Sequence, residues 1–187
     1  ARRQPGSGFK PFIYSAALDE GFTPSSMILD MPVVLEGGGE ENWRPENSGG
    51  DFAGPLRLRE ALVRSRNTVS IRILQSIGTR YAQDYSSRFG FDAEKHPPYL
   101  TMALGAGSVT PWQMATAYSV FANGGYRINP YVVSEIRDEK NNVLAQAAPV
   151  PAGEGSVRAI DPRNAFLMDS MLRDVTVYGT AAKASVA

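Results

Sequence analysis

Ser7 and Lys10 have the residue types and the spacing needed for nucleophilic chemistry, since they open and close the tetrapeptide Ser-Gly-Phe-Lys. On a helix that begins near Ser7, Lys10 lies one turn later on the same face, so its amine can approach the serine hydroxyl. A serine hydroxyl attacks well only when a base takes its proton. Lysine can serve as that base if burial or cationic neighbours lower its pKa from about 10.4 toward neutrality.

A helix start at Ser7 would favour acyl transfer for a second reason. The free backbone amides and the positive end of the helix dipole stabilise the oxyanion that forms when a serine attacks a carbonyl. A Ser-x-x-Lys match, however, arises by chance about once in a chain of this size. The position of the motif at a predicted helix start is therefore what favours a functional interpretation over a coincidence.

Ser65-Arg66-Asn67 is the second candidate, and it lies between two stretches with helical periodicity. Ser65 can pass a proton between Lys10 and a leaving amine. Asn67 carries both a hydrogen-bond donor and an acceptor, which suits it to holding a substrate amide. The alternative is a helix junction at which Ser65 and Asn67 only cap the following helix.

The composition limits the chemistry that remains open. The 19 basic and 19 acidic residues are scattered along the chain, which gives no electrostatic reason to expect nucleic acid or an anionic membrane surface as a partner. The absence of cysteine excludes disulfides, thiol nucleophiles and Cys-ligated zinc. His96, the only histidine, precedes two prolines and is expected to be a loop or packing residue. We therefore expect no metal, no cofactor and a base other than histidine.

Hydrophobic periodicity predicts the elements that must position these residues. Helices are expected over residues 7–20, over 56–77, over 80–89 after Gly78, from the capping box Thr110-Pro-Trp-Gln113 to Phe121, and from Asp161 onward. Extended or irregular segments are expected as a strand at 27–35, a long loop at 36–55, a hairpin of 131–136 with 142–145, and a connector at 146–158.

At this point the chain resembles the transpeptidase domain of class A penicillin-binding proteins. The matching segments occur in the family's order over almost the whole chain: Arg3-Gln-Pro-Gly-Ser-Gly-Phe-Lys-Pro-Phe-Ile-Tyr14, Trp43-Arg-Pro-Glu-Asn47, Gly54 to Asn67, Leu104 to Pro111, Phe121 to Tyr126, and Val177 to Ala182. Ser-x-x-Lys followed by Ser-x-Asn also has the order of the first two motifs of serine acyl-enzymes that process D-alanyl peptides and β-lactams.

The resemblance implies an α/β (α+β) fold of the serine β-lactamase and penicillin-binding transpeptidase type. Residues 1–187 are expected to be a partial domain, mostly its helical side plus a β-hairpin, with part of the central sheet missing. The third motif, Lys-Thr-Gly, is absent, because none of the four lysines (Lys10, Lys95, Lys140 and Lys183) begins it. We expect both ends to be cuts through a longer protein, whose upstream glycosyltransferase domain and anchor would hold it at the periplasmic face of the inner membrane.

The resemblance also implies a role for each candidate residue. Ser7 is the nucleophile that attacks the penultimate D-Ala of a peptidoglycan stem peptide, Lys10 is the general base, Ser65 relays the proton and Asn67 orients the substrate. An amine of a neighbouring stem peptide resolves the acyl-enzyme, and β-lactams acylate Ser7 as substrate mimics. Stem peptides, β-lactams and cell-wall assembly proteins are therefore the expected partners.

Three alternatives remain at this stage. A serine β-lactamase also uses Ser-x-x-Lys, but Arg66 replaces the Asp of its Ser-Asp-Asn motif, and no glutamate is marked by its context as a deacylating base. A non-catalytic module of the same fold in cell-wall assembly would not need Ser7, Lys10, Ser65 and Asn67 intact. A helical globular domain with coincidental motifs would leave Ser7 and Ser65 far apart.

Overall fold

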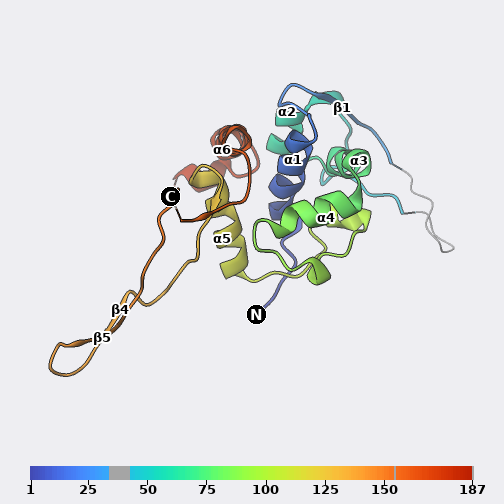
Figure 1. Ribbon diagram of the computed structural model, residues 1–187. Coiled ribbons are helices and arrows are strands. Elements are labelled where there is room, and N and C mark those ends of the chain that lie inside the picture. The colour runs from blue at the N-terminus through green and yellow to red at the C-terminus, as the bar shows by residue number, and fades with distance from the viewer. Residues whose placement is uncertain (34–42, 154, 187) are drawn as a thin grey trace.

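A computed structural model describes residues 1–33, 43–153 and 155–186, and helices are its main elements (Figure 1). These described segments contain six α-helices: α1 (Lys10–Asp19), α2 (Leu58–Val63), α3 (Asn67–Ile77), α4 (Thr79–Ser87), α5 (Pro111–Ala122) and α6 (Pro162–Val177). Four 3-10 turns accompany them: η1 (Gly6–Phe9), η2 (Ala93–Lys95), η3 (Leu100–Leu104) and η4 (Ala182–Val186).

Helix α1 is the centre of the core. Its residues from Lys10 to Ala17 are all buried, and it packs against α3, α4 and α6 (Figure 1). The Phe12 ring lies 4.9 Å from Phe89 and 4.8 Å from Phe91, centroid to centroid. A helix that is apolar nearly all round is stable only when neighbours cover it on every side. The site residues at its first turn are therefore held by the largest packed region of the chain.

A buried polar cluster links α1 to α4 and α6. Ser15 Oγ lies 2.9 Å from Tyr85 Oη and donates to Asn164 Oδ1 at 2.8 Å. Asn164 Nδ2 in turn donates to the Ser15 carbonyl at 2.8 Å. Because each buried polar group has a partner, the cluster fixes how α6 sits on α1 without leaving an unsatisfied donor or acceptor.

The strands form three antiparallel pairs. They are β1 (Met27–Asp30) with β2 (Gly54–Arg57), β3 (Tyr126–Arg127) with β6 (Val157–Arg158), and β4 (Glu135–Arg137) with β5 (Val143–Gln146). The β4–β5 hairpin projects away from the helices in Figure 1. In the described part of the chain, no sheet has more than two strands. The mixed helical and strand content agrees with the predicted fold class.

Several predicted elements are confirmed. The hairpin and the last helix lie where the periodicity placed them, and Asp161 accepts a hydrogen bond from the Arg163 amide. The first helix differs at its start, because Gly6–Phe9 is a 3-10 turn and α1 begins only at Lys10. The capping box at α5 is complete, because Thr110 Oγ1 accepts from the Gln113 amide and Gln113 Oε1 accepts from the Thr110 amide. These features depend on neighbours within four residues, which a sequence displays directly.

Other predictions were wrong. The segment 54–57 is a strand instead of loop and helix, and its pairing of Ile28 with Leu56 joins segments far apart in sequence. The first predicted strand ends at Asp30, the first hairpin strand begins only at Glu135, and the connector contains β6. Apolar residues at two-residue spacing next to a helix fit both the strand period and the helix period. Pairing with a distant segment therefore decides whether they form a strand. Residues 34–42 of the predicted loop lie outside the described residues.

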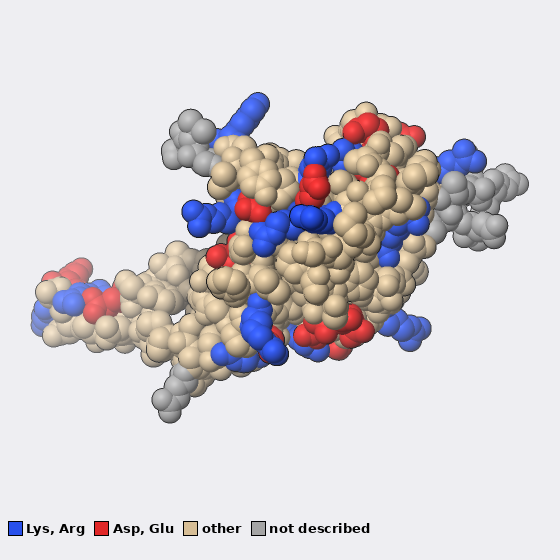
Figure 2. Space-filling view, turned by 90° about the horizontal axis from the view of Figure 1, so that it is seen from above, with Lys and Arg blue, Asp and Glu red and all other residues tan. Residues whose placement is uncertain are grey.

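Basic and acidic side chains are interspersed on the face shown in Figure 2. None of the helices in the described segments is long and apolar enough to cross a bilayer.

Candidate active site

The turn that carries Ser7 is fixed from two sides. Gly6 N donates to the Gly105 carbonyl at 3.3 Å, and a Cβ at Gly105 would lie 2.1 Å from the Gly6 oxygen. Gly105 also has a φ of 70°, so this close approach requires glycine. On the other side, Tyr118 Oη donates to the Gly8 carbonyl at 2.8 Å. Ser7 is exposed at the tip of this supported turn.

Lys10, which follows this turn as the first residue of α1, is fully buried. Its Nζ donates to the Ser65 carbonyl at 2.6 Å, to Ser65 Oγ at 3.0 Å and to Asn67 Oδ1 at 2.6 Å. No ion pair among the described residues involves Lys10, and burial lowers its pKa to about 8. Burial disfavours the charged form of an amine, so Lys10 is poised to lose a proton close to neutral pH.

Ser65 occupies a position that glycine usually takes. Helix α2 ends in a Schellman motif, in which Ser65 N donates to the Leu62 carbonyl at 2.9 Å and Arg66 N to the Ala61 carbonyl at 3.0 Å. The φ of Ser65 is 53°, in the left-handed region that costs a residue with a Cβ about 1 kcal/mol or more. This conformation turns both the carbonyl and the hydroxyl of Ser65 toward Lys10.

Asn67 begins α3 and faces two sides of the site. Its Oδ1 accepts from Lys10, while its Nδ2 donates to the Glu46 carbonyl at 2.7 Å. The Asn67 amide donates to Asn47 Oδ1 at 2.8 Å. Neither Ser65 nor Asn67 caps α3 with its side chain, since Arg66 is the N-cap and no side-chain cap bond forms there. The interpretation of Ser-x-Asn as a simple helix cap is therefore wrong.

Arg66 closes the site against the preceding loop. It binds Asp51 through two hydrogen bonds, of 2.9 and 3.0 Å, and its Nε lies 3.4 Å from the buried Asp30. Burial alone would raise the pKa of Asp30. Hydrogen bonds from Thr68 and Asn47 lower this pKa by more than burial raises it, so the Asp30 carboxyl stays ionised at pH values below its usual pKa.

Two pockets meet at Ser7. One, of about 190 Å³, is bounded by Ser7, Lys10, Ser65, Tyr118 and Thr180 among others. The second, of about 500 Å³, lies between Ser7, the loop at Asn47 and Thr180. Ser7 makes no hydrogen bond to Lys10 in the described structure, because the three bonds of Nζ go to Ser65 and Asn67. The Ser7 hydroxyl is therefore open to a ligand, while the Lys10 amine is held by Ser65 and Asn67.

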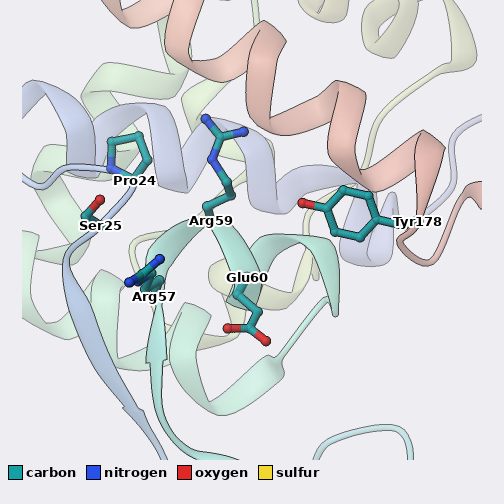
Figure 3. Close-up of a pocket in the computed structure, with 6 residues that line it drawn as sticks. All are labelled: Pro24, Ser25, Arg57, Arg59, Glu60 and Tyr178. Carbon is teal, nitrogen blue, oxygen red and sulfur yellow. The ribbon is translucent and has the colours of Figure 1, made fainter.

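A third pocket, of about 370 Å³, contains none of the predicted site residues. Figure 3 shows Arg59 and Tyr178 at its wall, with Ser25 at the opposite side. Arg59 is already paired with Asp174 at 2.6 Å. Its charge is therefore largely engaged within the protein, and we place no chemistry there.

His96 packs as expected, and does not face the pockets. It is buried, and its ring stacks on Phe9 with centroids 4.8 Å apart. Within residues 1–33, 43–153 and 155–186, no group of three or more His, Asp or Glu side chains could hold a metal ion.

The structure brings Lys10, Ser65 and Asn67 into direct contact and places Ser7 in the same pocket. The alternative of coincidental motifs, which required Ser7 and Ser65 to lie far apart, is wrong. Sequence reasoning missed the contacts of Asp30, Arg66 and Tyr118. No local signal marked Asp30 or Tyr118. The Trp-x-Pro-x-Asn segment pointed to Asn47 without indicating what it touches.

An exposed serine beside a buried lysine, with a Ser-x-Asn segment around the lysine, is the layout of a serine acyl-transfer site that uses no histidine. The sequence pattern of the family described as "Penicillin binding protein transpeptidase domain" matches residues 1–187. The chain belongs to this family.

Relatives with known names agree with this assignment. The chain is 53% identical over 187 residues to penicillin-binding protein 1A of Neisseria lactamica, covering 99% of this chain and 23% of that protein. It is 43% identical to penicillin-binding protein 1A of Pseudomonas aeruginosa, covering 98% of this chain and 28% of that protein. The chain thus spans about a quarter of the length of the curated relatives it matches.

Solved structures have the same fold. The crystal structure of penicillin-binding protein 1A from Haemophilus influenzae matches with a TM-score of 0.87 and 34% identity, over 95% of this chain and 31% of that one. The imipenem acyl-enzyme complex of penicillin-binding protein A from M. tuberculosis matches with a TM-score of 0.81 at 22% identity, over 93% of this chain and 44% of that one. The second likeness concerns the fold alone.

Proposed function

We propose that this chain forms the acyl-accepting side of the cleft in a D,D-transpeptidase, an enzyme that cross-links peptidoglycan stem peptides. Ser7 is the nucleophile, Lys10 the base, Ser65 the proton relay and Asn67 a group that orients the substrate. The observation that carries the proposal is the buried Lys10 amine, which has hydrogen bonds to Ser65 Oγ and Asn67 Oδ1 and opens on the same pocket as Ser7.

The proposed reaction has two displacements. Ser7 Oγ attacks the carbonyl carbon of the penultimate D-Ala while Lys10 Nζ takes the hydroxyl proton. The C–N bond to the terminal D-Ala then breaks, and the proton passes through Ser65 Oγ to the leaving nitrogen. An amine of a second stem peptide next attacks the acyl carbon and gives a proton to Lys10 Nζ, which returns it to Ser7 Oγ as the ester bond breaks and the cross-link forms. A β-lactam acylates Ser7 by the same attack, but ring opening keeps its leaving nitrogen attached to the adduct.

The lowered pKa of Lys10 sets the expected pH dependence. With a pKa of about 8, about one tenth of the Lys10 side chains are neutral at pH 7 and half at pH 8. If neutral Lys10 is the base, the rate of Ser7 acylation rises about fivefold between these two pH values and levels off above pH 9. A rate that is flat from pH 6.5 to 9 would point to another base.

Labelling with a fluorescent penicillin tests the nucleophile. The experiment uses the intact transpeptidase that carries this sequence, and one label per molecule is expected. Ser7→Ala abolishes the label, while Ser25→Ala retains it, because Ser25 is an exposed serine in the separate pocket of Figure 3. Unchanged labelling of Ser7→Ala would overturn the assignment, and rapid release of the adduct would favour a β-lactamase.

The wider setting is part of the proposal. None of the four lysines of the 187 residues begins a Lys-Thr-Gly motif, so we expect a further strand to complete the cleft opposite Ser7. The isolated chain is then not expected to cross-link peptides. We also propose that the intact protein acts at the periplasmic face of the inner membrane, where stem peptides, β-lactams and wall-assembly proteins are its partners.

A further inference from the structure

The carboxamide of Asn67 has two unlike ends, and which end faces Lys10 decides whether Lys10 can act as a base. In the structure Oδ1 faces Lys10 Nζ at 2.6 Å, and Nδ2 donates to the Glu46 carbonyl at 2.7 Å. A neutral amine has two N–H groups, which the Ser65 carbonyl and Asn67 Oδ1 can accept at 2.6 Å each, so its lone pair is left for a hydroxyl proton. The reversed carboxamide would donate an N–H to that lone pair and block it.

Asn47 controls the surroundings of Asn67. Its Oδ1 accepts from the Asn67 amide at 2.8 Å, and its Nδ2 donates to Asp30 Oδ1 at 2.8 Å and to the Asp51 carbonyl at 2.9 Å. The neighbouring residue, Glu46, supplies the carbonyl that holds Asn67 Nδ2. The orientation of Asn47 and the place of that carbonyl are therefore set together.

Asp30 determines the orientation of Asn47. It is fully buried, and its Oδ2 already accepts from the Ala53 amide at 3.0 Å and lies 3.4 Å from Arg66 Nε. An ionised carboxylate has no N–H to offer, so Asn47 can only turn its Nδ2 toward it. Asn47 Oδ1 is then left for the Asn67 amide. Asp30 thus fixes Asn47 against the main-chain amide of Asn67, and the adjacent Glu46 carbonyl accepts from Asn67 Nδ2, which leaves Oδ1 for Lys10.

We propose that Asp30 and Asn47 are positioning residues of this site, which together hold the Asn67 carboxamide with its oxygen toward Lys10 Nζ. The inference rests on the proposed function, because it assigns Lys10 the role of base. It adds two residues that touch neither Ser7 nor Lys10 in the described structure but select the form in which Lys10 can accept a proton.

Among the described residues, the other ionisable groups around Lys10 leave it as the group that titrates near pH 8. Arg66 is paired with Asp51 and lies beside Asp30, and the pKa of each carboxyl is lowered. On the α5 side, burial raises the pKa of Tyr118 to about 12. The pH profile of Ser7 acylation between pH 6.5 and 9.5 therefore reports the state of Lys10.

The central test is Asp30→Asn in the intact transpeptidase, read as the pH profile of Ser7 acylation by a fluorescent penicillin. The variant carboxamide keeps its oxygen toward the Arg66 charge and presents its NH₂ to Asn47, which reverses Asn47. The reversed Asn47 presents an N–H to the Asn67 amide, so the hydrogen bond between Asn47 Oδ1 and that amide is lost. The hydrogen bond from Asn67 Nδ2 to the adjacent Glu46 carbonyl is then lost as well. We expect the plateau rate to fall about tenfold or more and the midpoint to move below that of the parent, because the ammonium loses an acceptor.

The matched control is Asp174→Asn, which also removes an ion-paired carboxylate but lies on α6 outside the hydrogen-bond line. We expect its midpoint and plateau to equal those of the parent. A role of Asp30 in stability alone would lower the amount of protein that can be labelled and leave the midpoint unchanged. That outcome would overturn the proposal.

An exchange of the two groups provides the rescue. Asn47→Asp places a second carboxylate against Asp30, so we expect a slow variant with a raised midpoint, because added negative charge favours the ammonium form of Lys10. The double variant Asp30→Asn with Asn47→Asp restores a donor facing an acceptor, and an oxygen again faces the Asn67 amide. It is expected to acylate faster than either single variant. If Asp30→Asn does not fold, Asn47→Asp carries the pH test and the double variant carries the rescue.

Failure of this inference is distinguishable from failure of the proposed function. If Ser7→Ala retains the penicillin label, the assignment of the nucleophile is wrong whatever Asp30 does. If Ser7→Ala loses the label but Asp30→Asn keeps the parental midpoint, or the double variant is no faster than the slower single variant, the transpeptidase assignment stands and the positioning role is refuted.

Discussion

Ser65 combines a strained backbone with a functional side chain, and replacing it should separate stability from activity. Both Ser65→Ala and Ser65→Gly remove the hydroxyl that lies 3.0 Å from Lys10 Nζ. Only glycine also relieves the left-handed backbone at φ 53°. We therefore expect both variants to lose the proton relay, while Ser65→Gly is more stable than Ser65→Ala.

The expected magnitudes follow from the geometry. A residue with a Cβ in the left-handed region costs about 1 kcal/mol relative to glycine, so the free energies of unfolding should differ by about that amount. For a domain of this size, about 1 kcal/mol corresponds to a difference in Tm of about 2–4 °C. Loss of general acid–base assistance lowers the acylation rate about a hundredfold or more in both variants.

Calorimetry and penicillin labelling of the intact protein measure the two effects. Asn141 provides a matched control, because it is the other non-glycine residue with positive φ in the described structure and lies in the β4–β5 turn. Asn141→Ala and Asn141→Gly should show the same difference in Tm with unchanged acylation. If Ser65→Ala melts at or above the Tm of Ser65→Gly, the strain argument fails. If either Ser65 variant acylates at the parental rate, the relay role fails.

Three further outcomes follow from the packing. Gly105→Ala should lower the free energy of unfolding by about 2 kcal/mol or more and slow acylation, because its Cβ would lie 2.1 Å from the Gly6 oxygen. A Tm equal to that of the parent would contradict the close approach. Asn164→Leu should destabilise the domain by about 2 kcal/mol in urea unfolding, since it removes the hydrogen bonds of Asn164 with both the hydroxyl and the carbonyl of buried Ser15. A stabilised variant would show the cluster to be dispensable. Burial lowers the pKa of His96, so the unfolded chain binds a proton at this histidine before the folded protein does. The free energy of unfolding should therefore decline as pH falls through about 6.5. If His96→Gln keeps the same decline with pH, other groups cause it.

The sequence predicted best what neighbouring residues determine. The capping box at Thr110, the cap of α6 at Asp161 and the spacing of Ser7 and Lys10 all depend on contacts within one helical turn. The pairing of Leu29 with Pro55 joins segments more than twenty positions apart, and no periodicity in 54–57 distinguishes a two-residue from a helical pattern. The strand β2 was therefore missed.

The candidate site shows the same contrast between features set by neighbouring residues and features set by distant contacts. Ser65 and Asn67 were identified by type, but the left-handed backbone of Ser65 was not, because serine seldom takes the place of glycine at a helix end. Asp30 was read only as part of an apolar strand. Its role depends on Asn47 and Asn67, and a hydrogen-bond line across three separate segments has no signature in any one of them.

The packing of His96 gives the protein an intrinsic spectroscopic probe. These 187 residues contain one histidine, so in the isolated chain its imidazole protons produce a single set of resonances that needs no isotope label to be recognised. The ring lies 4.8 Å from Phe9 and 5.2 Å from Phe91, close enough for ring currents to displace those resonances strongly. Phe9 belongs to the turn that carries Ser7. A ligand that shifts this turn when it occupies the pocket will therefore move the histidine signals, and its arrival can be followed at a buried ring that does not line the pocket.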